Sequence, residues 1–253
     1  MISIIEAIIL GIVQGLTEWL PISSSGHLVL FQHLFGLEVP IVFDVILHLG
    51  SLLVIFFVFW KDIKKLFFGV LKGNKFYLKY FSYLILATIP IGLVGFFLKD
   101  IVESAFGDVR IVGYSLLLTA LILFLSKYPK NKEKKLTWKS GLMVGLCQAL
   151  AIFPGVSRSG TTISVGLMQG INREEAARFS FLLFIPAILG ATVLEIGDIS
   201  SISNLPALLI GTLTTIIVGF FSLKWLLKVI KRGNFSYFAW YCLGLGIVIL
   251  VLM

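Results

Sequence analysis

The sequence predicts an all-α polytopic membrane protein with two inverted-topology repeats, each a broken re-entrant helical hairpin followed by three transmembrane helices. Three observations lead to this prediction: the composition, a series of long apolar runs, and a similarity between the two halves of the chain. Of the 253 residues, 58% are hydrophobic and only 13% are charged. A soluble domain would carry about a quarter charged residues. The chain is therefore expected to form one integral membrane domain.

Six apolar runs approach the roughly 20 residues that a helix needs to cross a bilayer. They lie at about 41–60, 77–98, 109–126, 176–195, 207–223 and 236–253. Two further apolar stretches, 1–40 and 140–170, are each interrupted near the middle by Pro, Gly and Ser. These interruptions predict re-entrant hairpins. We expect a first repeat over 1–130, with its hairpin at about 1–40, and a second repeat over 131–253, with its hairpin at about 140–170.

The distribution of basic residues predicts how these segments are oriented. Segments 61–79 and 127–139 hold six Lys each, and segment 224–232 holds three Lys and one Arg, which together make up 16 of the 21 basic residues. Because cytoplasmic loops are enriched in Lys and Arg, we expect all three segments in the cytoplasm. The intervening loops carry acidic residues instead: Asp100, Glu103 and Asp108 in one, Glu195 and Asp198 in the other. Corresponding spans of the two halves then run in opposite directions.

A direct similarity between the two halves supports the repeat. With a constant offset of 134, GIVQGLTEWLPISSSG (11–26) lies without gaps over GLCQALAIFPGVSRSG (145–160). The identical pairs are Gly11/Gly145, Gln14/Gln148, Leu16/Leu150, Ser23/Ser157, Ser25/Ser159 and Gly26/Gly160. In membrane proteins with inverted repeats and interrupted helices, binding sites form at the repeat interface near the middle of the bilayer.

Each break carries residues suited to binding an anion. Pro21 should end or kink the first half-helix, and the serines after it are good N-caps for a helix that begins near Gly26. Pro154 and Gly155 interrupt the second hairpin in the same way. The free N–H groups and the dipole of such helix N-termini attract phosphate. The expected phosphate-binding residues are Ser23, Ser25, Ser157, Arg158, Ser159, Gly160 and Thr161.

Five side chains near the breaks carry the expected chemistry. Arg158 occupies the repeat position of Ser24 and needs an anionic partner, either a bound phosphate or an internal pair with Glu18. Gln14 and Glu18 lie four residues apart on one helix face. They suit a divalent cation, a base with an orienting neighbour, or a structural hydrogen bond.

Ser24 and His27 fall on one face of the second half-helix and form a possible nucleophile–base pair. The alternative is that the serines cap the helix while His27 bonds a carbonyl group. His33 and His48 have fewer polar neighbours in the sequence and are expected to be structural.

Together these residues indicate a phosphate site with acid–base groups inside the lipid bilayer. The expected substrate is amphipathic, with its tail in the bilayer and its phosphates in the polar pocket. A transporter or flippase of an anionic lipid is the main alternative, because phosphate binding alone would explain Arg158 and the caps. Hydrolysis is favoured because it makes use of Glu18, Ser24 and His27, which binding does not require. A dual role stays open, whereas a structural scaffold has little support.

At these residues the sequence resembles the undecaprenyl-diphosphate phosphatases of the bacitracin-resistance type, over essentially the whole chain. QGLTEWLPISSSGH (14–27) is similar to that family's first signature, an (E/Q)xxxE element that runs into a Ser-rich turn and a histidine. PGVSRSG (154–160) is similar to its second signature. The resemblance implies an enzyme that removes the terminal phosphate of the C55 isoprenyl diphosphate carrier of cell-wall synthesis and recycles the carrier as its monophosphate.

Carried over residue by residue, the resemblance implies that Glu18 is an essential acid, as metal ligand or base. Ser24 would be the nucleophile or a phosphate contact, His27 its acid–base partner, and Arg158 the phosphate clamp. Gln14 stands where some family members carry Glu, which weakens the expectation of a metal at Gln14 and Glu18 because one charge is missing. A covalent phosphoserine and direct attack by water are both compatible with these residues.

The resemblance also implies assistance by a divalent cation such as Mg²⁺ or Ca²⁺. It implies a multi-pass protein of the bacterial plasma (inner) membrane, with the active site opening to the extracytoplasmic side. The expected partners are the membrane and a polyprenyl diphosphate lipid, and a homodimer is compatible with the sequence. The basic residues of the loops are explained by their role in orienting the protein in the membrane, so no nucleic-acid partner is expected.

Overall fold

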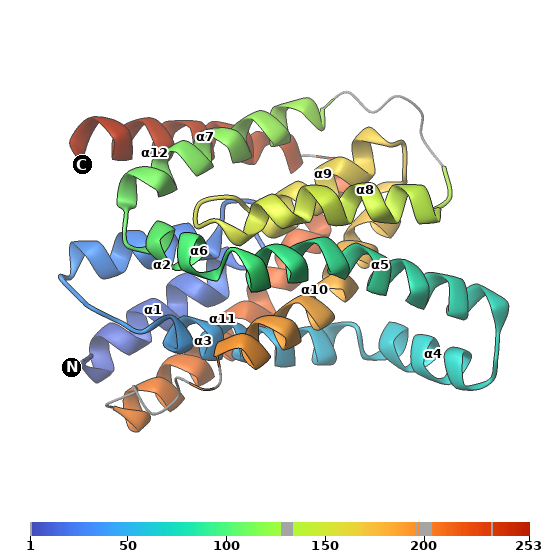
Figure 1. The fold of residues 1–253 in the computed structure, drawn as a ribbon, viewed down its shortest axis with the longest axis horizontal. Helices are drawn as coiled ribbons and strands as arrows, with labels where there is room; N and C mark the ends of the chain where they lie inside the picture. The colour runs from blue at the N-terminus through green and yellow to red at the C-terminus, as the bar shows by residue number, and fades with distance from the viewer. Residues whose placement is uncertain (1, 128–133, 196, 198–203, 234) are drawn as a thin grey trace.

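The computed structural model describes all residues except 1, 128–133, 196, 198–203 and 234. In the described residues the regular elements are helices, and most run along the long axis of the molecule (Figure 1). The six expected spans correspond to α3 (Ile41–Val58), α5 (Lys75–Phe97), α7 (Val109–Leu125), α10 (Arg173–Glu195), α11 (Leu205–Arg232) and α12 (Phe238–Leu252). Five of these segments are long and apolar enough to cross a membrane, and α7 reaches that length together with the preceding helix. The protein is therefore a multi-pass membrane protein.

Pairs of shorter helices lie where the sequence predicts the two broken hairpins. The first consists of α1 (Ile4–Thr17) and α2 (Ser24–Leu34). The second consists of α8 (Trp138–Gln148), the short 3-10 helix η1 (Ala149–Ile152) and α9 (Arg158–Met168). The side chains of Ser23 and Ser157 cap α2 and α9 by accepting from the backbone N–H three residues later. This confirms the predicted caps, and in both hairpins the chain leaves the first helix before it reaches the proline.

Three segments that were expected as loops are helical. The basic segment after α3 contains α4 (Trp60–Leu71), which separates apolar from charged side chains, and α6 (Lys99–Phe106) precedes α7 at an angle of 100°. Segment 224–232 continues α11 to Arg232, and Gly233 ends that helix with a left-handed φ of 85°. The middle of segment 127–139 and Asp198 lie outside the described residues.

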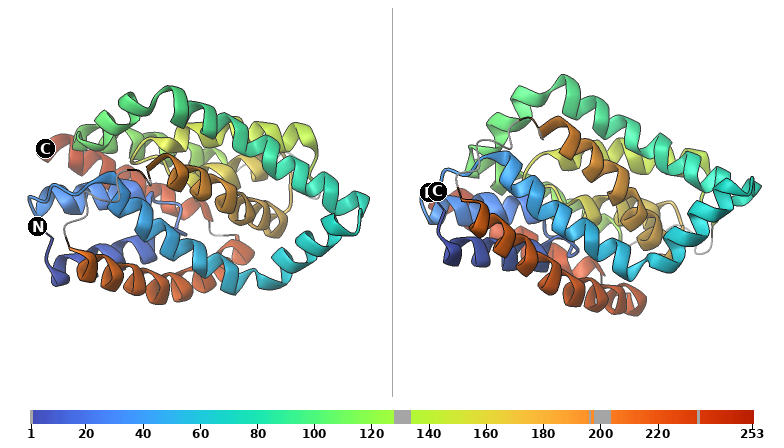
Figure 2. Two further views of the ribbon diagram at one scale, coloured as in Figure 1. Left: turned by 60° about the horizontal axis from the view of Figure 1, so that its bottom comes forward. Right: turned by 90° about the horizontal axis from the view of Figure 1, so that it is seen from below.

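Helices from the first half of the chain pack on helices from the second half. The closest neighbour of α1 is α11, that of α8 is α5, and that of α7 is α12, while α3 lies between α10 and α11. The two views of Figure 2 show the same interleaving of early and late segments. Both termini lie at one end of the molecule, and the turn between α4 and α5 lies at the other (Figure 1).

Glycines allow the closest of these helix contacts. A Cβ atom on Gly11 of α1 would lie 2.3 Å from the carbonyl oxygen of Gly211 on α11. A Cβ atom on Gly145 of α8 would lie 2.4 Å from the carbonyl oxygen of Ala87 on α5. Small residues let backbones approach in this way in membrane helix pairs. Gly11 and Gly145, which match in the two halves of the sequence, thus perform the same packing role.

Candidate active site

The tips of the two hairpins meet in the centre of the bundle. The backbone N–H of Gly155 donates to Ser23 Oγ at 3.1 Å, and Ser159 Oγ donates to the carbonyl of Leu20 at 3.2 Å. Ser23 is the one non-glycine residue in the described chain with a positive φ, at 67°. Such a conformation is costly for a residue with a side chain. The two caps and the contact between the tips hold Ser23 in place.

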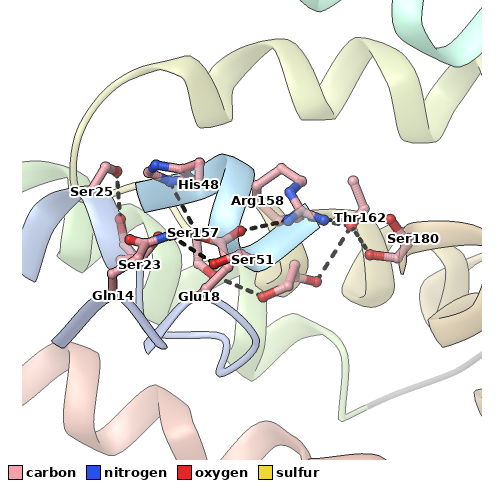
Figure 3. Close-up of polar contacts among 12 residues, drawn as sticks. Gln14, Glu18, Ser23, Ser25, His48, Ser51, Ser157, Arg158, Thr162 and Ser180 are labelled. Atoms are coloured by element: carbon pink, nitrogen blue, oxygen red, sulfur yellow. Dashed lines mark hydrogen bonds and ion pairs between the residues drawn. The ribbon is translucent and has the colours of Figure 1, made fainter. Parts of the chain in front are cut away.

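Glu18 is the centre of the polar contacts between these tips (Figure 3). Its Oε2 atom accepts from Gln14 Nε2 at 3.0 Å and from Ser24 Oγ at 2.5 Å. His48 Nε2 lies 3.2 Å from the same oxygen. The other oxygen, Oε1, accepts from Arg158 Nη2 at 2.7 Å. The carboxylate is buried, and the groups that contact it come from four helices: α1, α2, α3 and α9.

Arg158 is the cation that the first hairpin lacks. Its guanidinium lies 4.2 Å above the centre of the Phe184 ring and donates to the carbonyl of Ser180 at 3.4 Å. Only 12% of the side chain is exposed. The internal pair with Glu18 that the sequence left as an alternative is therefore formed. A guanidinium held on one side by a carboxylate keeps further N–H groups for a second anion.

His48 belongs to the site, although it was expected to be structural. Its Nδ1 atom lies 2.7 Å from the carbonyl oxygen of Asp44, and its Nε2 atom faces Glu18. A carbonyl and a carboxylate both only accept hydrogen bonds, so both contacts are favourable when each ring nitrogen carries a proton. His48 would then be a second cation beside Glu18. The sequence contained a signal for this role, because an ionisable residue within a membrane span is by default a candidate functional residue.

A cavity of about 200 Å³ opens beside these groups. Its polar lining consists of Glu18, Ser23, Ser24, Ser25, His48, Ser157 and Arg158, with Lys99, Glu103 and Glu195 further along. The rest of the lining is mostly apolar and comes from α3, α5, α6, α10 and the second break. Lys99 Nζ lies 3.3 Å from a carboxylate oxygen of both Glu103 and Glu195. The cavity thus joins a charged end to apolar walls, which fits an amphipathic ligand.

Three of the expected phosphate contacts do not line this cavity. Ser159 is turned toward the carbonyl of Leu20, and Thr161 is fully buried, with no hydrogen-bond partner for its hydroxyl among the described residues. Gly160 packs against Ser157, whose side chain already accepts from its N–H. The physical reason is that the first turn of α9 faces the other hairpin, so only its leading residues reach the cavity.

His27 does not pair with Ser24, which corrects the expected nucleophile–base arrangement. Its Nδ1 atom lies 2.7 Å from the carbonyl oxygen of Ser23, and its Nε2 atom lies 2.8 Å from Tyr241 Oη on α12. The rings of His27 and Tyr241 are stacked, with centroids 5.7 Å apart. The structure thus has the alternative arrangement, in which His27 bonds a backbone carbonyl group. Ser24 instead donates a hydrogen bond to Glu18.

The residues around Glu18 do not form a ready-made metal cage. Both carboxylate oxygens already accept from protein donors, and one of them accepts from a guanidinium. Mg²⁺ and Ca²⁺ require several oxygen ligands. Within the described ranges, no group of three or more His, Cys, Asp or Glu side chains could hold a metal ion. The side-chain oxygen of Gln14 is buried and has no hydrogen-bond partner among the described residues, so it could offer a single ligand.

The described helices define a multi-pass membrane protein with a candidate site of buried polar and charged side chains at the centre of the bundle. The family model "Bacitracin resistance protein BacA" matches residues 7–248, and the chain belongs to this family. Curated relatives named undecaprenyl-diphosphatase are similar over their full lengths. The protein of Methanosphaera stadtmanae is 44% identical, with 100% of this chain and 99% of the relative covered. The proteins of Halothermothrix orenii (42% identical, 99% and 98% covered) and Bacteroides thetaiotaomicron (40% identical, 98% of each covered) are similar as well.

Proposed function

We propose that this protein is an undecaprenyl-diphosphate phosphatase. It hydrolyses the terminal phosphate of the C55 isoprenyl diphosphate to the monophosphate, which recycles the lipid carrier for cell-wall synthesis and confers resistance to bacitracin. Family membership and the names of the full-length relatives support this function. The structural observation that carries it is the buried chain of hydrogen bonds from Ser24 through Glu18 to Arg158, which combines a hydroxyl, a base and a phosphate-binding cation.

The short hydrogen bond between Ser24 and Glu18 supports a covalent mechanism. Ser24 Oγ attacks the terminal phosphorus while its proton moves to Glu18 Oε2, 2.5 Å away. The bond from that phosphorus to the bridging oxygen breaks, and the polyprenyl monophosphate leaves. Water then hydrolyses the phosphoserine, which releases inorganic phosphate and restores the Ser24 hydroxyl. In this mechanism Glu18, rather than His27, is the base.

Arg158 and the two helix N-termini would bind the phosphate. The first N–H groups of α2 and α9 have no partner within their own helices and favour negative charge. Bound phosphate would also compete with Glu18 for the Arg158 guanidinium. As the guanidinium turns from Glu18 to the phosphate, the carboxylate becomes a better proton acceptor, because a nearby cation no longer stabilises its charge. The base is thereby activated when the substrate is in place.

A divalent cation bound to the substrate phosphates would be held here by side chains at the end of α1. The hydrogen bonds to Glu18 leave little room for a resident metal, whereas Mg²⁺ commonly binds through substrate phosphates and one or two protein ligands. Gln14 would supply such a ligand through its side-chain oxygen, which has no partner among the described residues, and Glu18 would supply another once Arg158 has turned to the phosphate. The cation would neutralise charge on the diphosphate, and the protein groups would orient the phosphate and accept the proton.

The inverted repeat is supported by reciprocal contacts between the tips. A Cβ atom on Gly26 would lie 2.8 Å from Gly155, and one on Gly160 would lie 3.2 Å from Pro21. Under the offset of 134, Gly26 matches Gly160 and Pro21 matches Gly155. A two-fold relation requires such exchanged pairs. We place the protein in the plasma membrane with the cavity open to the outside, because Glu103 of α6 and Glu195 at the end of α10 line it, away from the three Lys-rich segments.

A phosphate-release assay tests this function. Purified protein in detergent is given a polyprenyl diphosphate in the presence of Mg²⁺ or a chelator. We expect phosphate release that falls by about a hundred- to a thousandfold in Arg158→Gln, as when other preorganised charge-stabilising groups are removed. Arg178→Gln is the matched control, because Arg178 forms a half-exposed pair with Asp62 away from the cavity. Wild-type rates in a folded Arg158→Gln protein, or phosphate release that never exceeds background, would refute the proposal.

The two histidines are expected to differ in their effect on turnover. His48→Ala removes a hydrogen bond to a charged group, which typically contributes about 1.5–3 kcal/mol. We therefore expect turnover to fall about ten- to a hundredfold, with partial rescue in His48→Gln because its amide can still donate to Glu18. His27→Phe should lose less, since its ring contacts Tyr241 and not Glu18. A larger loss of turnover in His27→Phe than in His48→Ala would contradict this assignment.

A further inference from the structure

A second, larger cavity lies beside the start of α5. That helix begins at the end of the molecule that carries the turn between α4 and α5 (Figure 1). Its volume is about 1130 Å³. Five basic and two acidic side chains line it: Lys79, Lys134, Lys135, Arg173, Lys231, Glu174 and Glu175. They come from both halves of the chain, namely from α5 in the first half, and from the residues before α8, the start of α10 and the end of α11 in the second.

The positive charge of this cavity is only partly neutralised by the protein. Glu174 pairs with Lys231 at 3.3 Å, and Glu175 pairs with Arg178 at 3.4 Å. The other four basic side chains of the lining form no ion pair with any residue in the described ranges. Both acids are therefore already engaged, and the cavity has an excess of cations. Such an arrangement favours an anionic ligand.

A buried hydroxyl adds a specific polar contact. Tyr80 lines the cavity and is 9% exposed; its Oη atom makes no hydrogen bond of ordinary geometry with the described residues, although the Glu175 carboxylate lies nearby. The ring is fixed by an edge contact with Phe179, with centroids 5.8 Å apart. A buried hydroxyl without a partner is costly. An anionic oxygen in the cavity would accept from it.

The apolar part of the lining indicates what carries the anion. Leu136, Leu167 and Ile171 lie beside the basic side chains, together with the rings of Phe76 and Tyr83. Phe76 is 66% exposed and lies in the first turn of α5, a span whose apolar window is only 22% buried and so faces lipid. A free phosphate ion has no apolar surface to bury against these residues, whereas the start of an acyl chain does.

We propose that this cavity binds the phosphate headgroup of an anionic membrane phospholipid, with the Tyr80 hydroxyl and the four basic side chains that have no ion pair within the described residues as its ligands. Basic pockets between transmembrane helices on the cytoplasmic side bind lipid headgroups in other proteins. The cavity is separate from the site at Glu18, and the proposal does not depend on the hydrolytic function. Because its lining comes from both halves of the chain, the bound lipid would stabilise their packing.

The test compares two double variants of the purified, detergent-solubilised protein. Lys79→Gln with Arg173→Gln removes two charges from the cavity. Lys64→Gln with Lys224→Gln removes two charges outside it, where these lysines stack on the rings of Trp60 and Phe220. The apparent affinity for phosphatidylglycerol is measured by native mass spectrometry. Basic residues near a membrane surface contribute about 1 kcal/mol each, so we expect about a thirtyfold weaker affinity in the first variant and little change in the second.

Tyr80→Phe removes only the hydroxyl and should weaken phosphatidylglycerol binding severalfold without loss of folding, as checked by thermal unfolding. Phosphatidylcholine, which has no net charge, should bind the wild type more weakly than phosphatidylglycerol. Equal binding of the two lipids, or equal losses in the two double variants, would overturn the proposal. Binding of inorganic phosphate that depends on Lys79 and Arg173, with no preference for phosphatidylglycerol, would overturn it as well and assign the cavity to a free anion.

Discussion

Replacing Glu18 by glutamine is expected to reduce the rate of phosphate release by about a hundred- to ten-thousandfold, the usual contribution of a general base. The variant keeps the size of the side chain and one oxygen that can accept from Arg158. It loses the ability to take a proton from Ser24, whose hydroxyl lies 2.5 Å from Glu18 Oε2. It also leaves the buried Arg158 and His48 without their counter-charge. Steady-state phosphate release from a polyprenyl diphosphate measures the effect.

The control for this variant is Glu38→Gln, which removes the same charge from an exposed position between α2 and α3. Ser24→Ala should cause a loss similar to that of Glu18→Gln. When two residues act as one unit, the effects of replacing them on the rate are strongly non-additive. The double variant should therefore be little slower than either single variant. Losses that multiply in the double variant would show that Glu18 and Ser24 act independently. Normal turnover by a folded Glu18→Gln protein would exclude Glu18 as the base.

Replacing Gly145 by alanine is expected to destabilise the protein by about 1–3 kcal/mol or more, which is the usual cost of overpacking. The added Cβ would lie 2.4 Å from the Ala87 carbonyl oxygen and 2.5 Å from the Ala87 Cα. Backbone atoms cannot rotate away as a side chain can, so α8 and α5 would have to separate. The second tip would move with α8 and carry Arg158 away from Glu18. Thermal unfolding in detergent and the rate of phosphate release should both decline.

Gly92→Ala provides the matched control for Gly145→Ala. Gly92 lies within α5, and a Cβ atom there would have no neighbour within 4 Å. Alanine is favoured over glycine in a helix interior by roughly 0.5–1 kcal/mol, so Gly92→Ala should be neutral or stabilising. The two substitutions are chemically identical and should therefore have opposite signs. A melting temperature for Gly145→Ala at or above that of the wild type would contradict the close packing of α8 on α5.

Much of the fold could be predicted because the lipid bilayer imposes strict requirements on the length and apolarity of the spans. Spans must be apolar and about twenty residues long, and all six expected spans have a helical counterpart. The breaks were predictable because proline and serine act locally on the backbone. The helices α4 and α6 were missed because each is short and mixes charged with apolar residues, which resembles a loop when only mean hydropathy is considered. Their apolar faces were the signal that could have revealed them.

The residues of the candidate site were predictable where they lie in the two breaks, because the two halves of the sequence match there. Glu18, Ser24 and Arg158 were expected, and the pairing of Arg158 with Glu18 was one of two stated alternatives. His48 was missed because its partner Glu18 lies 30 positions earlier in the chain, and nothing in the sequence fixes that distance. The pairing of Ser24 with His27 was wrong because spacing places two residues on one helix face but does not say which neighbour that face meets. Here His27 meets Tyr241 of α12.

The interleaved packing of early and late helices has a consequence for how the protein is made. The first hairpin enters the membrane at the start of synthesis, yet its main packing partner α11 begins only at Leu205. Glu18 has no Arg158 until the second hairpin has been made, and α1 lacks its packing partner for longer still. We expect the nascent hairpin to stay near the translocation machinery or at the bilayer surface, and to settle only when the last two helices arrive. A chain truncated before α11 should therefore be recognised and degraded as unassembled.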